Sequence, residues 1–265
     1  MITFVVASRN AHKAVEIRAV LGPGARCFSL ADLVLLKHRE PEKEPSCPPS
    51  DAEPDFKSTC GPRTEMQVRE ARTTLDAMLD IVEDEPTFAG NALKKARAVA
   101  SWLVSDRNMH CLGGAVYVMA DDSGLEVDAL HGEPGVRSAR YASATGSGNS
   151  PDGLNNAKLL TELAKLTEGA RSARFRCSIA IVPLGSSDGI SALEHGGDGA
   201  LVFEGTCEGR IALTPRGAGG FGYDPLFIPS GWEISFAELG EDVKNRISHR
   251  ARALGFVKKH FGLNQ

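Results

Sequence analysis

The sequence predicts a mixed fold of the α/β or α+β class, and three observations lead to this prediction. Apolar runs of strand length alternate along the chain with stretches that repeat apolar residues at helical spacing. The chain contains no internal repeat. Its 265 residues, 42% hydrophobic and 24% charged, are enough for one large or two-lobed domain and exclude a mostly disordered, collagen-like or coiled-coil chain.

The chain begins with a strand, a loop and a helix. Ile2 to Ala7 is an apolar run that indicates a buried strand. After a turn, Ala14, Ile17 and Leu21 fall on one face at helical spacing, and Gly22-Pro23 supplies the residues that commonly end a helix.

Residues 37–82 are predicted to be a proline-rich and helical insertion. Six of the 14 prolines lie between Pro41 and Pro62 among charged residues, so this stretch cannot bury enough apolar surface to offset the entropy of ordering it. Apolar residues at helical spacing from Val68 to Val82 then predict one helix. We therefore treat residues 1–265 as a single domain that carries this insertion.

The remaining elements are predicted from their apolar patterns. Alternation between buried and exposed residues indicates a half-exposed strand near the middle of the chain, and a turn at Asp121–Gly124 is expected to separate two strands. In chain order the elements are a helix at 93–103, strands at 115–120 and 125–129, a helix at 159–166, strands at 173–181, 201–207 and 210–214, and a closing helix at 251–261.

Composition and charge narrow the function classes. The net charge of -4 gives no basic surplus, so we expect no nucleic-acid partner. No apolar run approaches the roughly 18 residues of a membrane span, and the first residues lack a basic leader, so we expect a cytoplasmic protein. Six cysteines without a C-x-x-C pair are then expected to be reduced thiols: Cys27, Cys47, Cys60, Cys111, Cys177 and Cys207.

The first motif is Ser8-Arg9-Asn10-Ala11-His12-Lys13, between the first strand and the first helix. Backbone N–H groups at a helix start carry partial positive charge and Lys13 adds a full charge, so the segment suits a phosphate. The alternative is plain helix capping, which any loop of this kind provides. The segment lacks the pattern of a P-loop.

The second motif is Asp121-Asp122-Ser123-Gly124. Two adjacent carboxylates beside a hydrophobic sheet repel each other and lose hydration, which raises a pKa unless a cation compensates. Mg²⁺ binds one or two carboxylates together with substrate phosphates, and the acidic run Glu83-Asp84-Glu85 offers a further carboxylate. The alternative is an ordinary turn and a solvated acidic loop.

The third motif is the glycine-rich segment 217–225. It contains G-x-G-x-x-G, but Pro225 prevents the helix that a dinucleotide fingerprint must open. Glycines permit close approach of the backbone to a ligand, and Phe221 or Tyr223 offers an aromatic face for a base. The alternative is a merely flexible loop.

The fourth motif, Lys244-Asn245-Arg246-Ile247-Ser248-His249-Arg250, is expected to open the last helix with Ser248 as a cap. Its four potential cations are typical of a solvated basic helix face. The alternative is polar recognition of a base and phosphates from the start of a helix.

Together these motifs resemble the inosine triphosphate pyrophosphatase family, whose members hydrolyse non-canonical purine nucleoside triphosphates. The matching pieces follow the order of the family and span nearly the whole chain outside the insertion. They are residues 8–13, Thr87-Phe88 with Asn91-Ala92 and Lys95-Ala96, residues 120–125, 134–141 and 219–225, and Lys244 with residues 247–250.

The resemblance implies an elongated mixed β-sheet flanked by helices, with two lobes and a substrate cleft between them. It also implies a homodimer, dependence on Mg²⁺, and cleavage of dITP, ITP or XTP between the α- and β-phosphates to give the monophosphate and pyrophosphate. The alternatives are a pyrophosphatase of the septum-formation type that acts on other modified nucleotides, and a non-catalytic nucleotide-binding module.

Residue by residue, Asp122 matches the catalytic base and metal carboxylate of the family, with Asp121 beside it as a further metal ligand. The family has a metal-binding Glu shortly before its Thr-Phe pair, and an ungapped match places Val82 at that position. Glu83 becomes a metal ligand only if the match is shifted by one residue. The resemblance implies substrate contacts at Ser8, Arg9, Asn10, Ala11, His12, Lys13, Ser123, Phe221, Gly222, Tyr223, Asp224, Lys244, His249 and Arg250.

Overall fold

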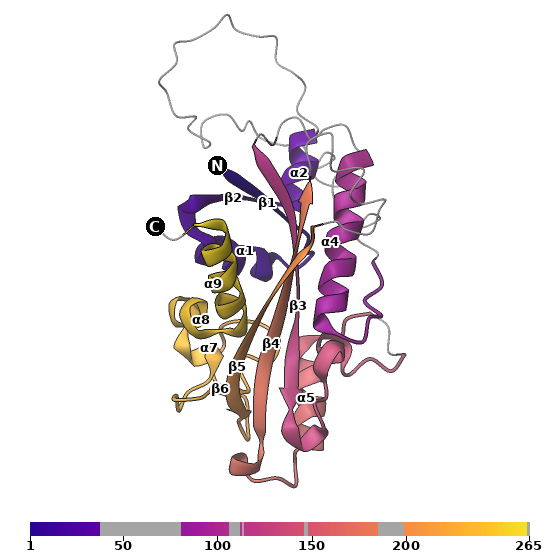
Figure 1. Cartoon of the computed structure of the whole chain (residues 1–265). Helices are drawn as coiled ribbons and strands as arrows, with labels where there is room; N and C mark the ends of the chain where they lie inside the picture. Colours follow the sequence, from indigo (N-terminus) through magenta and orange to yellow (C-terminus); the bar gives the residue numbers. More distant parts are fainter. Residues whose placement is uncertain (38–80, 106–111, 113, 146–147, 185–198, 264–265) are drawn as a thin grey trace, which may run out of the picture.

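The structure is a computed structural model of the chain, and it describes residues 1–37, 81–105, 112, 114–145, 148–184 and 199–263 (Figure 1). These residues contain a six-stranded mixed sheet with the strand order β2-β1-β3-β4-β5-β6. The strands are β1 (Ile2–Val6), β2 (Ala25–Ser29), β3 (Ala115–Val127), β4 (Ser172–Leu184), β5 (Leu201–Ile211) and β6 (Phe227–Pro229).

Helices cover the sheet and confirm the predicted fold class. In Figure 1, α4 stands on one side of the long strands, and α1, α8 and α9 stand on the other. The helices are α1 (Ala11–Leu21), α2 (Leu30–Lys37), α4 (Phe88–Ser105), α5 (Asp152–Glu162), α7 (Phe236–Leu239), α8 (Glu241–Ile247) and α9 (His249–Phe261), with short 3-10 turns that include η4 (Gly135–Arg140).

The short first strand leaves part of the long third strand uncovered. β1 is parallel to both β2 and β3, whereas the neighbouring pairs β3–β4, β4–β5 and β5–β6 are antiparallel. β1 pairs with β3 only from Ala115 to Met119, but β3 continues to Val127. In open α/β sheets, ligands bind beyond the carboxyl ends of the parallel strands, and that region here adjoins residues 120–127 of β3.

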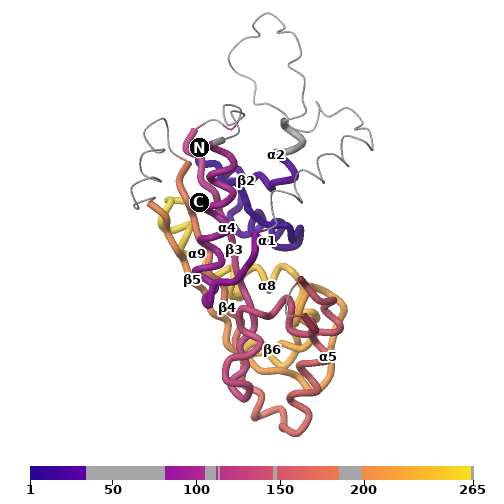
Figure 2. Tube along the Cα trace, turned by 90° about the vertical axis from the view of Figure 1, so that its right-hand side faces the viewer, coloured from indigo at the N-terminus to yellow at the C-terminus, as the bar shows by residue number. Residues whose placement is uncertain are grey.

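Three hydrophobic clusters form the core of the described residues. One lies between α4 and one face of the sheet, and a second lies between the opposite face and helices α1 and α9. A third surrounds the lower half of the sheet together with α5, α7 and β6. Figure 2 shows α5 and β6 away from α1 and α2. The sheet therefore carries two packed regions along its length.

Strand alternation determines which side chains face which helices. In β3, Val118 and Ala120 pack in the cluster under α4, and Met119 packs in the cluster under α1 and α9. Because successive side chains of a strand point to opposite faces, the neighbouring residues Asp121 and Asp122 are separated by the sheet.

The predicted turn at Asp121–Gly124 is wrong, because these residues lie in the middle of β3. The strands predicted at 115–120 and 125–129 form one strand, which stays paired with β4 through Asp121–Ile179 and Gly124–Arg176. Gly124 is needed there for close packing. A Cβ atom on it would lie 2.5 Å from the Gly135 carbonyl oxygen.

Three further predictions need correction. The strands at 201–207 and 210–214 form the single strand β5, because its pairing with β4 is continuous. β4 is half-exposed only in its first half, since helices cover both faces from Cys177 to Val182. The helix predicted to reach residue 166 ends at Glu162, and β2 and α2 were not predicted.

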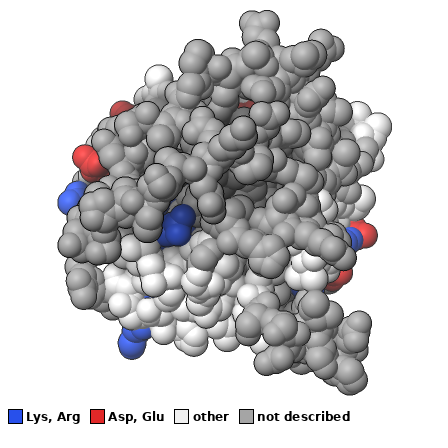
Figure 3. All heavy atoms as spheres, turned by 90° about the horizontal axis from the view of Figure 1, so that it is seen from above, with Lys and Arg blue, Asp and Glu red and all other residues white. Residues whose placement is uncertain are grey.

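Other expectations are tested only in part. Most of the 37–82 insertion, including its predicted helix up to residue 80, lies outside the described residues. Cys27, Cys177 and Cys207 are free thiols as expected, and the other three cysteines fall outside the described ranges. No helix that the structure describes has the length and apolar content needed to cross a membrane. Seen from above, the coloured side chains in Figure 3 carry charges of both signs.

The close contact between β5 and α9 predicts opposite effects for two glycines. A Cβ atom on Gly205 of β5 would lie 2.1 Å from the His249 carbonyl oxygen, whereas one on Gly255 of α9 would meet no atom within 4 Å. We expect Gly205→Ala to destabilise the protein by about 1–3 kcal/mol. Gly255→Ala should stabilise it by up to about 1 kcal/mol. Urea denaturation of both variants tests this, and shifts in the same direction would contradict the packing.

Candidate active site

The segment from Ser8 to Lys13 lies beyond the carboxyl end of β1, beside the uncovered part of β3. Asn10 caps α1, because its side-chain oxygen accepts hydrogen bonds from the backbone N–H groups of His12 and Lys13 at 2.9 and 3.3 Å. Ala11 is the first residue of the helix, and Arg9 is exposed in the bend before it. The capping interpretation is therefore confirmed, while phosphate contact by this segment stays a prediction.

Asp121 lies at the centre of a buried group of cations. Lys13 Nζ is 2.6 Å from its Oδ1, and Arg250 donates from Nη2 and Nε to its Oδ2 at 3.0 and 3.1 Å. Burial alone would raise the pKa of Asp121, but the charges of Arg250, Lys13 and Lys95 outweigh burial and hold that pKa well below its usual value. Asp121 is therefore ionised, and protein cations hold both of its oxygens.

Asp122 faces the opposite side of the sheet and has a different environment. It is 6% exposed, its Oδ1 lies 3.4 Å from Lys95 Nζ, and its Oδ2 has no hydrogen-bond partner among the described residues. Burial, together with the negative charges of Glu83 and Asp121, raises the pKa of Asp122, and the charges of Lys95 and Lys13 offset this only in part. A buried carboxylate with a raised pKa and a free oxygen is suited to accept a proton.

Crowding between the two aspartates is therefore not what separates their pKa values. Asp121 raises the pKa of Asp122 only as the smallest of several causes, and its own pKa is lowered. The structure brings Asp122 together with Lys95 and Glu83, but it places Asp121 with Lys13 and Arg250 on the other face.

Lys95 of α4 joins Asp122 to Glu83. Its Nζ lies 3.1 Å from Glu83 Oε1 and donates to the Asp121 carbonyl oxygen at 2.8 Å. Desolvation opposes its charge, but Asp122 and Glu83 raise the pKa of Lys95, which stays protonated. Lys95 belonged to the matching pieces of the sequence without a predicted role. Its position one helical turn after Asn91 is the signal that could have identified it.

Backbone contacts hold Glu83 in this position. Arg140 donates from Nη2 to the Glu83 carbonyl oxygen at 2.9 Å, and Asn91 exchanges two hydrogen bonds with the backbone of Glu85. Val82, which the ungapped match favours, is 64% exposed, and Asp84 pairs instead with Lys94. The structure therefore supports the shifted position, with Glu83 next to Asp122.

Asp122 and Glu83 fit a hard divalent cation that is shared with a substrate. No group of three His, Cys, Asp or Glu side chains that could hold a metal alone occurs in the described part of the chain. Mg²⁺ does not require one, because it keeps waters and binds one or two carboxylates together with phosphate oxygens. The unpartnered Oδ2 of buried Asp122 is a suitable donor for such an ion.

The glycine-rich segment contacts α7, although its residues 217–220 are exposed, and the flexible-loop alternative stays untested. A Cβ atom on Gly219 would lie 2.9 Å from the Ala237 carbonyl oxygen. Tyr223 is buried and donates its hydroxyl hydrogen to the Ser138 carbonyl oxygen at 2.9 Å, so it is a core residue and offers no face to a base. Phe221 remains partly exposed, and Lys244 Nζ lies 4.3 Å from the centre of its ring.

The fourth motif spans two helices, and three of its four potential cations are buried. Lys244 lies in α8, Ser248 caps α9 by accepting a hydrogen bond from Ala251 N at 3.1 Å, and His249 and Arg250 begin α9. Lys244, His249 and Arg250 are 4%, 4% and 1% exposed. The interpretation as a solvated basic face is therefore wrong for these three side chains, whereas Arg246 is exposed.

Glu16 of α1 connects the cations of this motif and was missed in the sequence. Its carboxylate pairs with Lys244 Nζ at 2.8 Å and with Arg250 Nη1. Burial opposes ionisation, but Arg250 and Lys244 lower the pKa of Glu16 below its usual value. Its spacing of three residues from Lys13 places both on neighbouring positions of one helix face, which is the available signal.

A continuous ion-pair network results on this face of the sheet. Lys244 also pairs with Asp224 at 2.6 Å, and Arg250 Nη2 donates to Ser123 Oγ at 3.0 Å. The contacts form one chain, which we call the ion-pair network. It runs through Asp224, Lys244, Glu16, Arg250, Asp121 and Lys13.

His249 is held as a neutral side chain beside this network. Its ring stacks on Phe175 with 4.7 Å between the ring centres, and its Nδ1 has no hydrogen-bond partner within the described ranges. Burial, together with the charges of Arg250 and Lys244, holds the pKa of His249 well below its ordinary value. A neutral imidazole with an unused nitrogen can offer one directed hydrogen bond to a ligand.

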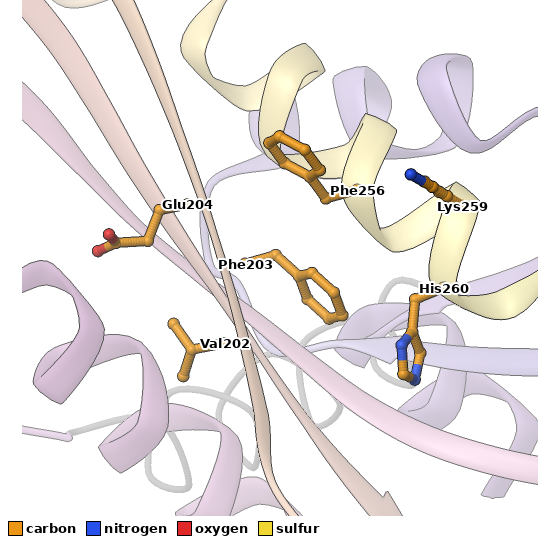
Figure 4. A pocket seen from close by; sticks show the side chains of 6 residues that line it. All are labelled: Val202, Phe203, Glu204, Phe256, Lys259 and His260. Atoms are coloured by element: carbon orange, nitrogen blue, oxygen red, sulfur yellow. The ribbon is translucent and has the colours of Figure 1, made fainter.

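A separate pocket lies along β5 and α9 and contains none of the predicted site residues. Figure 4 shows Phe203, Phe256 and His260 on the side of α9, with Val202 and Glu204 on the other side of the strand. The predicted site therefore does not coincide with this pocket.

Comparison with known proteins gives consistent relatives. The dITP/XTP pyrophosphatase of Opitutus terrae is 48% identical over 179 residues, which cover 68% of this chain and 76% of the relative. The dITP/XTP pyrophosphatase of Geobacter sulfurreducens is 43% identical over 183 residues, covering 69% and 78%. Among solved structures, a HAM1 protein from Coxiella burnetii matches with a TM-score of 0.66, 28% identity and full coverage of both chains.

A family model also matches the chain, from residue 54 onward. The model of the Ham1 family matches residues 54–260, which is more than half of the chain. The relatives named above confirm the resemblance to the inosine triphosphate pyrophosphatases. The chain belongs to the Ham1 family.

Proposed function

We propose that this protein hydrolyses non-canonical purine nucleoside triphosphates, in particular dITP, ITP and XTP, to the monophosphate and pyrophosphate. The names of the relatives support this substrate class. The observation that carries the proposal is the buried Asp122 with its raised pKa, free Oδ2 and contact to Lys95, next to Glu83.

Asp122 is the proposed base. A water molecule attacks the α-phosphorus, its proton passes to the carboxylate of Asp122, and the bond from the α-phosphorus to the bridging oxygen breaks to release pyrophosphate. Lys95 keeps this carboxylate oriented through its contact with Oδ1. Burial of the carboxylate raises its pKa towards the range in which a general base is most effective.

Asp122 and Glu83 would hold the Mg²⁺ ion, with the remaining ligands from water and the triphosphate. Bound there, the ion would neutralise negative charge on the phosphate oxygens. Asp121 is engaged by Lys13 and Arg250, so we propose it as a support for the cations and not as a ligand. A homodimer and a cytoplasmic location remain predictions from the family resemblance, and light scattering tests the first of them.

Recognition of the base is proposed to depend on Phe221 and His249. The partly exposed ring of Phe221 can stack on a purine. In its Nδ1-protonated tautomer, neutral His249 can donate to the keto oxygen of hypoxanthine or xanthine. Adenine presents an amino group at that position and would leave the donor unpaired, which discriminates strongly against it.

Pyrophosphate release from ITP, XTP, dUTP, GTP and ATP tests the proposed function. We expect ITP and XTP to be preferred over ATP and GTP. Preference for other modified nucleotides such as dUTP would favour an enzyme of the septum-formation type. Binding without turnover would indicate a nucleotide-binding module, although the retained arrangement of Asp122, Lys95 and Glu83 supports catalysis.

The two neighbouring aspartates should respond differently to the same substitution. Asp122→Asn should lower kcat by about 10²-fold or more, because it removes the base. The folded state raises the pKa of Asp122, so its ionised form opposes folding near neutral pH, and the midpoint of thermal unfolding should stay constant or rise.

Asp121→Asn is the matched control and should unfold more easily. It removes the carboxylate that accepts from Nε and Nη2 of buried Arg250 and leaves Glu16 as the remaining charged partner. Breaking a buried ion pair typically costs about 3–5 kcal/mol. Because folding lowers the pKa of Asp121, its stabilisation is present above the usual aspartate pKa of about 4 and is lost as the pH falls below it. Equal effects of both substitutions on kcat and on unfolding would contradict these assignments.

Glu83→Gln should raise the Mg²⁺ concentration needed for half-maximal activity by about tenfold, because one of two proposed carboxylate ligands loses its charge. Glu85→Gln is the control, since Glu85 is exposed and contributes hydrogen bonds through its backbone. Magnesium titrations of both variants measure the effect. An unchanged requirement in Glu83→Gln would remove Glu83 from the metal site.

A further inference from the structure

Helix α5 holds both hydrogen-bonding groups of a single backbone position in the glycine-rich segment. Gly222 N donates to Asp152 Oδ2 at 2.7 Å, and Asn156 Nδ2 donates to the Gly222 carbonyl oxygen at 3.1 Å. Asp152 and Asn156 are four residues apart and therefore lie on one face of the helix. Two side chains of one helix thus hold the backbone N–H and the carbonyl oxygen of the same residue.

These two hydrogen bonds fix the backbone conformation of Gly222, which sets the direction of the chain between Phe221 and Tyr223. The φ of Gly222, +62°, lies in the left-handed region, where a residue with a side chain would be strained. Gly222 also lies between Phe221, which faces the proposed base site, and Tyr223, which is anchored in the core. A rotation at Gly222 would therefore turn Phe221 while Tyr223 stayed in place.

The other side of Phe221 is already fixed. Its backbone N–H donates to Asp224 Oδ2 at 2.8 Å, and Asp224 is held in turn by Lys244. The ring of Phe221 lies against the His12 ring, with 5.6 Å between ring centres and 21° between ring planes. With Gly222 also held by α5, the position of the aromatic ring is determined from both ends.

We propose that Asp152 and Asn156 are positioning residues for base recognition, which fix Gly222 so that Phe221 presents its ring to the purine. This inference rests on the proposed function, because it assumes that Phe221 stacks on the base. Neither residue contacts the proposed reacting atoms. Their substitution should therefore weaken substrate binding much more than the chemical step.

Asn155 offers a matched control in the same helix. It is buried like Asn156, but it accepts a hydrogen bond from Ala142 N at 2.8 Å and donates to the Ala139 carbonyl oxygen at 3.2 Å. Asn155→Asp and Asn156→Asp make the same chemical change, loss of the amide donor, in adjacent buried positions. Only the second of them releases Gly222.

Steady-state kinetics with ITP is the first measurement. Asn156→Asp and Asp152→Ala should each raise KM about tenfold with kcat kept within about twofold, as expected for loss of binding that is uniform along the reaction. Asp152→Asn should restore KM, because its amide oxygen can still accept from Gly222 N. Asn155→Asp should lower thermal stability without this rise in KM. An equal rise in KM for Asn155→Asp and Asn156→Asp would overturn the proposal.

Amide hydrogen exchange at Gly222 provides a readout that does not depend on turnover. Exchange should be faster in Asp152→Ala than in the unmodified protein and in Asp152→Asn. Unchanged exchange in Asp152→Ala would overturn the proposal that Asp152 fixes Gly222, even if the enzyme is active. If exchange is faster in Asp152→Ala but the unmodified protein does not hydrolyse ITP, the hold of α5 on Gly222 is supported and the proposed function is rejected.

Discussion

The buried ion pair between Asp121 and Arg250 is the interaction on which the site depends. It joins the central strand β3 to the first turn of α9, and Lys13 and Glu16 extend it to α1. Removing one partner would leave a buried charge without compensation, which is far more costly than losing an exposed ion pair. The segment at the start of α1 and the residues at the start of α9 are therefore held in one arrangement.

Because Asp121 and Asp122 are neighbours in one strand, their side chains lie on opposite faces of the sheet and have different roles. Asp121 points to the cations of α1 and α9, whereas Asp122 points to Lys95 of α4. Three positive charges lower the pKa of the first, while burial with weaker compensation raises the pKa of the second. Pairs of titratable groups whose surroundings move their pKa values apart are typical of acid–base sites.

The sequence predicted elements whose patterns repeat locally, such as α1 with Ala14, Ile17 and Leu21 on its buried face. It failed where distant segments decide the local structure. Asp121–Gly124 has the composition of a turn, but continuous pairing with β4 makes it a strand. Lys95 and Glu16 were missed as site residues because a single charged residue on a helix usually faces solvent, and only the fold reveals their buried partners.

The charges of the site also support the proposed divalent cation. Lys13, Lys95, Lys244 and Arg250 each already have a carboxylate partner, as with Lys13 on Asp121 and Lys95 on Glu83. These four buried or half-buried cations face five carboxylates: Asp121, Asp122, Glu16, Glu83 and Asp224. This group of side chains therefore supplies no surplus positive charge to a triphosphate. A cation that arrives with the phosphates and takes Asp122 and Glu83 as ligands would provide a countercharge and leave the ion-pair network intact.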